Sequence, residues 1–182
     1  MLDISDSILE NDLYLIFSKA NEVKHKDQEI VSQLVKFDYQ IIIVTSNQPY
    51  TNLIKIYEEN KIDLSNVSFI DLITHYALGK TPENKTPEKC IFISNPANLT
   101  DTGIAITEMI NSNGGKKIAV VFDSITTMLI YMSSDQLSKF IHFLTNKFRL
   151  LGVKGFFFAV EGGIDPSLEV RFSTFMDVVI RD

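Results

Sequence analysis

Short runs of β-branched and aromatic residues recur along the whole sequence, and amphipathic segments separate them. Most runs are apolar throughout, a pattern typical of strands that are buried on both faces of a sheet. The runs interpreted as strands are residues 13–18, 40–46, 67–71, 90–94, 117–124, 155–161 and 177–181. Because helical segments lie between them, the connections are crossovers and the strands should be parallel. The sequence predicts a three-layer α/β fold, with a mostly parallel central sheet of about seven to nine strands and helices on both faces.

The segments with apolar residues at helical spacing are 28–37, 50–60, 98–111 and 135–150. Pro49 precedes the second segment, and proline suits the first turn of a helix. Asn98 is a candidate N-cap of the third segment, with Asp101 in its first turn. Gly152 follows the fourth segment, and glycine commonly ends helices.

Size and charge restrict the function classes. The 182 residues fit one domain, 1–182, and the segment 79–89 with its two Thr-Pro pairs predicts an exposed loop. Acidic residues outnumber basic ones by 23 to 17, a net charge of −6, which argues against a nucleic-acid partner. No apolar run is long enough for a membrane span, and the acidic N-terminus lacks signal-peptide features. We expect a cytoplasmic protein that contacts no membrane.

The strand at 117–124 ends in Asp123 and Ser124. Ligands of open α/β sheets bind outside the carboxyl ends of the strands, and nucleotide-hydrolysing folds place a Mg²⁺-binding carboxylate there. Asp123 is therefore the candidate metal ligand. The alternative is that Asp123 only caps the helix predicted at 125–132.

The glycine-rich loop that cradles phosphates, G-x-x-x-x-G-K-[ST], does not occur between the first strand and the first helix. Residues 19–27 contain no glycine and predict a charged, solvated loop, in which a nest of backbone amides would need positive φ from residues that resist it. Lysines there could still meet an anion as point charges. The candidate cofactor-binding residues are Lys19, Asn21, Lys24, Asp123 and Ser124.

Other reactive side chains give weaker patterns. Cys90 begins a predicted buried strand and is expected to pack as a small apolar residue, and His142 lies on the helix 135–150. Glu161 ends a strand at the same sheet edge as Asp123, so the two carboxylates could form the acid–base pair of an unrelated doubly wound enzyme. The alternative for Glu161 and the two glycines after it is a plain turn.

The order of the motifs resembles the RecA/KaiC-like ATPases over about residues 13–181. The matching pieces are PYTNLI at 49–54, FID at 69–71, VVFDS at 120–124 and MDVVI at 176–180. The resemblance implies a RecA-like topology, ATP with Mg²⁺ as the possible cofactor, and side-by-side assembly. It also implies that the catalytic glutamates of the family fall at Asn47 and Gln48, neither of which is a base.

The sequence thus combines the architecture of an ATPase with the loss of its phosphate chemistry. We expect a catalytically inactive RecA/KaiC-like domain without catalytic residues or a required cofactor, which acts as a regulatory or assembly subunit by binding another protein or itself. The alternatives are an ATP- or ADP-binding switch that does not hydrolyse nucleotide, and a weak ATPase with an atypical phosphate loop.

Overall fold

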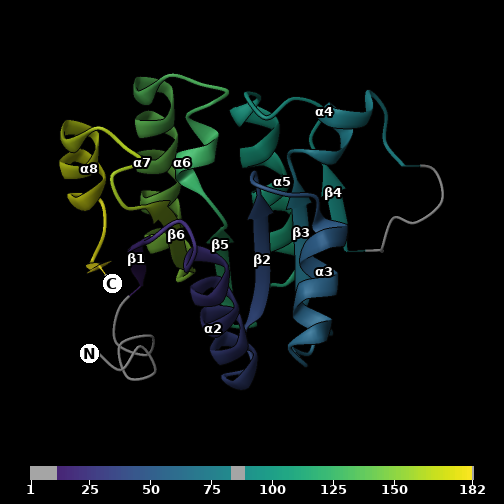
Figure 1. Ribbon diagram of the computed structural model, residues 1–182. Coiled ribbons are helices and arrows are strands. Elements are labelled where there is room, and N and C mark those ends of the chain that lie inside the picture. Colours follow the sequence, from purple (N-terminus) through teal and green to yellow (C-terminus); the bar gives the residue numbers. More distant parts are fainter. Residues whose placement is uncertain (1–11, 83–88, 182) are drawn as a thin grey trace.

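The computed structural model describes residues 12–82 and 89–181, and a seven-stranded sheet runs through this part of the chain (Figure 1). All neighbouring strands pair in parallel, in the order β4-β3-β2-β5-β6-β1-β7. The strands are β1 (Leu13–Ser18), β2 (Gln40–Thr45), β3 (Val67–Asp71), β4 (Cys90–Phe92), β5 (Ile118–Phe122), β6 (Lys154–Val160) and β7 (Val178–Arg181). The predicted α/β class and parallel sheet are confirmed.

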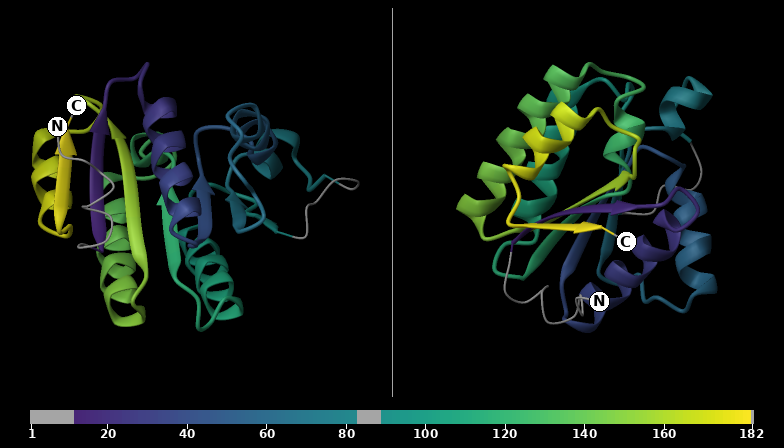
Figure 2. Two further views of the ribbon diagram at one scale, coloured as in Figure 1. Left: turned by 90° about the horizontal axis from the view of Figure 1, so that it is seen from below. Right: turned by 60° about the vertical axis from the view of Figure 1, so that its left-hand side comes forward.

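Helices cover both faces of the sheet, and Figure 2 shows the two layers on opposite sides of the strands. The helices are α2 (Val23–Lys36), α3 (Tyr50–Glu59), α4 (Thr74–Leu78), α5 (Leu99–Ser112), α6 (Ile125–Met128), α7 (Ser134–Leu151) and α8 (Pro166–Ser173). One apolar core lies between the sheet and α2 and α3. The other lies between the sheet and α5 to α8. Side chains alternate between these cores along the inner strands, which explains their unbroken apolar runs.

Most predicted helix ends are confirmed. The side chain of Asn98 accepts a hydrogen bond from the amide of Asp101 and caps α5. Ser133 and Gln136 form a capping box at the start of α7. Gly152 adopts a left-handed conformation after the same helix, which glycine does without a steric penalty.

The structure corrects the bounds of the first helix and of the strand at Cys90. The helix after β1 begins at Val23, not at Gln28, so half of the predicted loop 19–27 is helical. The strand at Cys90 is short and its residues are only partly buried, because β4 is an edge strand with a neighbour on one side. Of the predicted exposed loop, residues 83–88 lie outside the described residues, and Gly79 and Lys80 are exposed.

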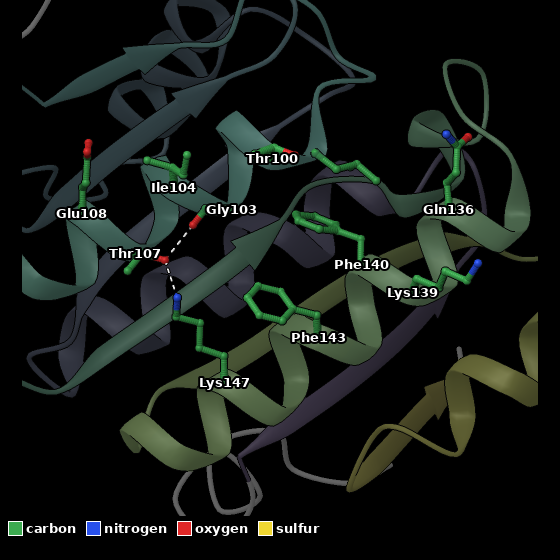
Figure 3. A pocket seen from close by; sticks show the side chains of 11 residues that line it. Thr100, Gly103, Ile104, Thr107, Glu108, Gln136, Lys139, Phe140, Phe143 and Lys147 are labelled. Atoms are coloured by element: carbon green, nitrogen blue, oxygen red, sulfur yellow. Dashed lines mark hydrogen bonds between the residues drawn. The ribbon is translucent and has the colours of Figure 1, made fainter.

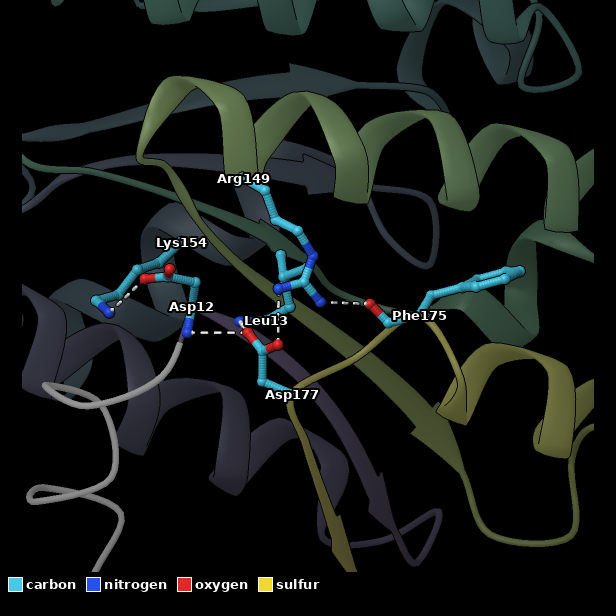
Figure 4. A network of polar contacts seen from close by, with 6 residues as sticks. All are labelled: Asp12, Leu13, Arg149, Lys154, Phe175 and Asp177. Carbon is cyan, nitrogen blue, oxygen red and sulfur yellow. Dashed lines mark hydrogen bonds and ion pairs between the residues drawn. The ribbon is translucent and has the colours of Figure 1, made fainter.

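A polar cluster attaches β7 to the start of β1 (Figure 4). The Asp177 carboxylate accepts hydrogen bonds from the backbone amides of Leu13, at 2.9 Å, and Asp12, at 3.2 Å. Arg149 on α7 donates to the same carboxylate at 2.7 Å. Burial opposes the ionisation of Asp177, but Arg149 and the two amides outweigh it, so the pKa of Asp177 lies below its ordinary value. The cluster fixes the register of β7, whose only sheet neighbour in the described part of the chain is β1.

No helix within residues 12–82 and 89–181 combines the length and hydropathy that crossing a bilayer requires. The cytoplasmic location and the extent of a single domain over 1–182 stay predictions.

Candidate functional site

The neighbouring strands β2 and β5 send the chain to opposite faces of the sheet at their carboxyl ends. β2 leads to α3, which packs in one core, and β5 leads to α6, which packs in the other. The two connections therefore diverge and leave a crevice, which is where open α/β sheets bind ligands. Asp123 and Ser124 lie on one side of this crevice, and Thr45 to Gln48 lie on the other.

Asp123 is buried and bridges the two sides of the crevice. Its Oδ2 accepts hydrogen bonds from Thr45 Oγ1, at 2.7 Å, and from the amide of Asn47, at 3.2 Å. Its Oδ1 accepts from the amide and the hydroxyl of Ser46, at 2.9 and 3.2 Å. Burial raises the pKa of Asp123 above its ordinary value, although the four donors oppose that shift. Both oxygens of Asp123 are thus occupied by donors of the chain itself.

The predicted alternative role of Asp123 as a helix cap is wrong, because Ser124 caps α6. The hydroxyl of Ser124 accepts a hydrogen bond from the amide of Thr127 at 3.1 Å. The predicted helix 125–132 is also shorter, ending at Met128. Asp123 instead links β5 to the end of β2, and Ser124 positions the start of α6.

A second carboxylate, Asp27, faces the same crevice from α2. Asp27 is 5% exposed, and its Oδ2 accepts a 2.6 Å hydrogen bond from the hydroxyl of Tyr57 on α3. Its Oδ1 has no hydrogen-bond partner among the residues that the structure describes. Burial raises the pKa of Asp27 to about 7; the bond from Tyr57 lowers it and the nearby Asp123 raises it further. Near neutral pH, a large fraction of Asp27 is therefore protonated.

The space between these groups is small. Its volume is about 20 Å³, enough for about one water molecule and far below the roughly 300–1,000 Å³ of small-molecule pockets. Lys24, Asn47 and Gln48 line it together with both carboxylates. The crevice is therefore nearly closed by side chains, and two of them are acidic.

The backbone at the start of α2 forms a closed turn. The amides of Glu22 and Val23 donate to the carbonyl oxygen of Lys19, at 2.8 and 3.1 Å, and those of His25 and Lys26 donate to Glu22 at 3.0 Å. Among the described residues, positive φ occurs outside this segment, whereas an anion-binding nest requires left-handed residues. These amides are therefore directed along the chain and are not gathered around an anion.

The candidate residues of this segment separate in space. Lys24 lines the cavity with Asp123, whereas Lys19 and Asn21 are exposed and are not among the residues that line it. Asn47 and Gln48, the positions of the family's catalytic glutamates, do lie at the cavity. The ligand-binding roles of Lys19, Asn21, Lys24, Asp123 and Ser124 stay predictions.

Asp27 was not among the residues predicted from the sequence. It lies two positions from Glu29 in a charged stretch, so composition suggests a solvated side chain. The available signal was its spacing from Val23 and Ile30, which places it on the buried stripe of the helix once the helix begins at Val23.

The other reactive side chains considered, Cys90, His142 and Glu161, do not line the crevice with Asp123. Burial raises the pKa of the Cys90 thiol, and so does the nearby Asp71, so the thiolate is disfavoured. His142 is exposed on α7, with its ring against Phe175. Glu161 is exposed and lies outside the residues that line the crevice. The described residues contain no cluster of three or more potential metal ligands among histidine, cysteine, aspartate and glutamate.

A second concave surface lies on the opposite side of the sheet from α2, between α5 and α7 (Figure 3). This α5–α7 groove has a volume of about 710 Å³. Ile104 and Phe143 line it and are 51% and 53% exposed, and Gly103 leaves room beside the ring of Phe140. The residues that line it are Leu99, Thr100, Gly103, Ile104, Thr107, Glu108, Gln136, Lys139, Phe140, Phe143 and Lys147.

Residues 33–182 match the model of DUF7504, a family of unknown function. The matched region begins inside α2, so β1 and the turn after it precede the match. No curated protein matches the sequence.

Several solved structures resemble the fold. The uncharacterised protein PH0321 from Pyrococcus horikoshii, crystallised in complex with an unknown peptide, is 15% identical with a TM-score of 0.64, covering 94% of this chain and 77% of that chain. The flagellar accessory protein FlaH from Methanocaldococcus jannaschii is 13% identical with a TM-score of 0.64, covering 93% and 70%. The KaiC-like protein PH0186 from Pyrococcus horikoshii OT3 is 12% identical with a TM-score of 0.63, also covering 93% and 70%. These similarities establish a RecA/KaiC-like fold.

Proposed function

The chain belongs to the DUF7504 family of unknown function, and we propose that it is a non-catalytic RecA/KaiC-like domain that acts by binding protein, as a regulatory or assembly subunit. The observation that carries the proposal is the state of the crevice. Where a phosphate-binding RecA-like site would be open, the cavity measures about 20 Å³ and has two buried carboxylates in its wall.

Electrostatics argues against a triphosphate at this place. Catalysis of phosphoryl transfer depends almost entirely on positioning and on positive charge around the phosphates. Here Asp27 and Asp123 face the cavity, and Lys24 is the one lysine within residues 12–82 and 89–181 that lines it. At the start of α2, the amides of Glu22 and Val23 donate to the carbonyl oxygen of Lys19, and those of His25 and Lys26 donate to that of Glu22. A polyphosphate would have to displace these contacts and approach two buried carboxyl groups.

The α5–α7 groove supports the protein-binding part of the proposal. Contiguous exposed apolar surface marks interaction sites in soluble proteins, and Ile104 and Phe143 provide such surface along two neighbouring helices. The structural relative PH0321 was crystallised with a peptide, so a protein of similar fold accommodates a polypeptide.

The first experiment measures ATP hydrolysis and nucleotide binding by the purified chain. We expect turnover at background level and no heat of binding with ATP or ADP at millimolar concentration, with or without Mg²⁺. Turnover above background that Asp123→Asn abolishes would overturn the proposal. Asn keeps one acceptor oxygen for the donors around it, so the variant removes the charge with limited damage to the fold.

A nucleotide-binding switch that does not hydrolyse is the second candidate, favoured by Lys24 at the same cavity as Asp123. This candidate predicts a calorimetric signal for ADP or ATP that Lys24→Ala weakens. The matched control is Lys36→Ala, at the exposed other end of α2. Silence in all titrations removes this candidate and supports the first.

A further inference from the structure

The two rims of the α5–α7 groove carry opposite charges. α5 presents the exposed Glu108, and α7 presents Lys147. Lys147 Nζ donates to Thr107 Oγ1 at 2.6 Å and lies 5.5 Å from the ring centre of Phe143. Both contacts are with uncharged groups, so a carboxylate that approached Lys147 from outside would form a charge-assisted hydrogen bond.

The two helices run in the same direction, and their contacts define which residues lie at the same level. A Cβ atom on Gly103 would lie 3.6 Å from the ring of Phe140, and Thr107 contacts Lys147 one turn further along. Glu108 therefore lies near the level of Lys147, and Ile104 lies near the level of Phe140 and Phe143. Figure 3 shows these side chains facing the groove from both helices.

The charges and apolar side chains of the groove are complementary to those of the same groove on a second copy of the chain. A two-fold axis along the groove would place α5 of one copy over α7 of the other, with levels preserved. Each Glu108 would then face the other copy's Lys147, and each Ile104 would meet the other copy's Phe143. Both contacts occur twice, as in any isologous interface. A helix of another protein in the groove would lie against Glu108 on one side and Lys147 on the other. A helix with only acidic or only basic residues would therefore complement one of these charges and be repelled by the other.

We propose that the α5–α7 groove is the interface of a symmetric homodimer, with a second copy of this chain as the occupant. The inference rests on the proposed function, because it names the partner of a domain that acts by binding protein. The interface uses the helical face of the fold and leaves the crevice between β2 and β5 free.

The test measures the molar mass of the chain by sedimentation equilibrium from about 1 to about 200 µM, a range that covers micromolar dissociation constants. We expect a concentration-dependent dimer. Phe143→Glu should raise the dissociation constant at least about tenfold, because it places two charges in the apolar centre. Leu150→Glu is the matched control on the same helix: Leu150 is 87% exposed and does not line the groove, so the dimer should persist.

Exchanging the charges of Glu108 and Lys147 tests their pairing across the dimer and leaves the apolar residues of the groove unchanged. Glu108→Lys and Lys147→Glu should each raise the dissociation constant about tenfold, and the double variant should return it to within about threefold of the parent, as expected for coupled residues. Circular dichroism and melting curves establish that each variant is folded. A chain that stays monomeric at about 200 µM overturns the inference, and so does a double variant that is no tighter than the single ones.

The outcomes separate the dimer from the proposed function. A monomer that neither binds nor hydrolyses nucleotide removes the dimer and leaves a partner of different sequence as the occupant of the groove. A dimer that hydrolyses ATP supports the interface and overturns the non-catalytic function.

Discussion

Two concave regions of the molecule differ in how completely their side chains are paired or buried within the chain. They are the crevice between β2 and β5 and the groove between α5 and α7. In the crevice, Asp123 accepts four hydrogen bonds from the chain, and Asp27 accepts one from Tyr57. In the groove, Ile104 and Phe143 keep about half of their surface in contact with solvent.

The difference indicates where recognition takes place. A polar group whose hydrogen bonds are already made internally, as those of Asp123 are, gains little from a ligand, because each new bond replaces an existing one. An apolar surface gains free energy when a partner removes it from water. The crevice, where the fold suggests a ligand, therefore has less to gain from binding one than the groove has from binding a partner.

The largest expected effect comes from removing Asp123. Asp123→Ala leaves buried donors of Thr45, Ser46 and Asn47 without an acceptor, which we expect to lower the free energy of unfolding by about 3 kcal/mol. Urea denaturation of both proteins measures it. An unchanged free energy of unfolding would contradict the contrast with the groove, because it would mean that the hydrogen bonds of Asp123 contribute nothing to the fold.

A smaller effect is expected from Asp27, and it depends on pH. Because the pKa of Asp27 is raised to about 7 in the folded chain, the folded state binds more protons than the unfolded state between about pH 4 and pH 7. The contribution to stability is fully present at low pH and is lost as the pH rises through about 7. Asp27→Asn should therefore exceed the parent in free energy of unfolding by about 2 kcal/mol at pH 8 and match it below about pH 4.

Denaturation at both pH values checks this prediction, with Glu59→Gln, an exposed residue of α3, as the control whose pH dependence follows the parent. Parallel curves for the parent and Asp27→Asn would mean that Asp27 is ionised at little cost, and the crevice would then be more open to cations or solvent than its contacts indicate.

The smallest effect is expected in the groove and has the opposite sign. Gly103 lies inside α5, where alanine is the better helix former, and its added Cβ atom would meet Phe140 at an ordinary contact distance. Gly103→Ala should raise the free energy of unfolding by about 0.5–1 kcal/mol while narrowing the groove and weakening dimerisation.

Thermal unfolding measures the change in stability of Gly103→Ala, and sedimentation measures the change in its dimerisation. Gly155→Ala is a contrasting control, because its Cβ atom would lie only 3.0 Å from side-chain atoms of Leu13 and Phe148 and should destabilise the core. If Gly103→Ala lost stability instead, the groove would be packed more tightly than its exposed side chains suggest.

The sequence was sufficient for the sheet and for most helix ends. Apolar runs such as the one in β1 mark buried parallel strands directly, and end residues such as Asn98 and Gly152 act within one turn of the chain. These features are local, so a single sequence carries them.

The candidate site was predicted only in part, because its contacts are distant in sequence. Asp123 was identified from its position after a strand, but its partners Thr45 to Asn47 lie more than 70 residues earlier. Asp27 was taken as part of a solvated loop, and its burial follows from Tyr57 on another helix. The opposed charges of Glu108 and Lys147 become meaningful only when α5 and α7 lie side by side.

The position of β1 in the sheet has a consequence for how the chain reaches this structure. Leu13 pairs with Gly155 of β6, and Asp177 binds its amide from a distance of 164 residues along the chain. During synthesis, β1 emerges from the ribosome long before either of its neighbours exists. Since contacts at such sequence separation slow folding and leave strand edges open to aggregation, the apolar segment 13–17 is the one that a chaperone would need to shield until residues near 180 have been translated.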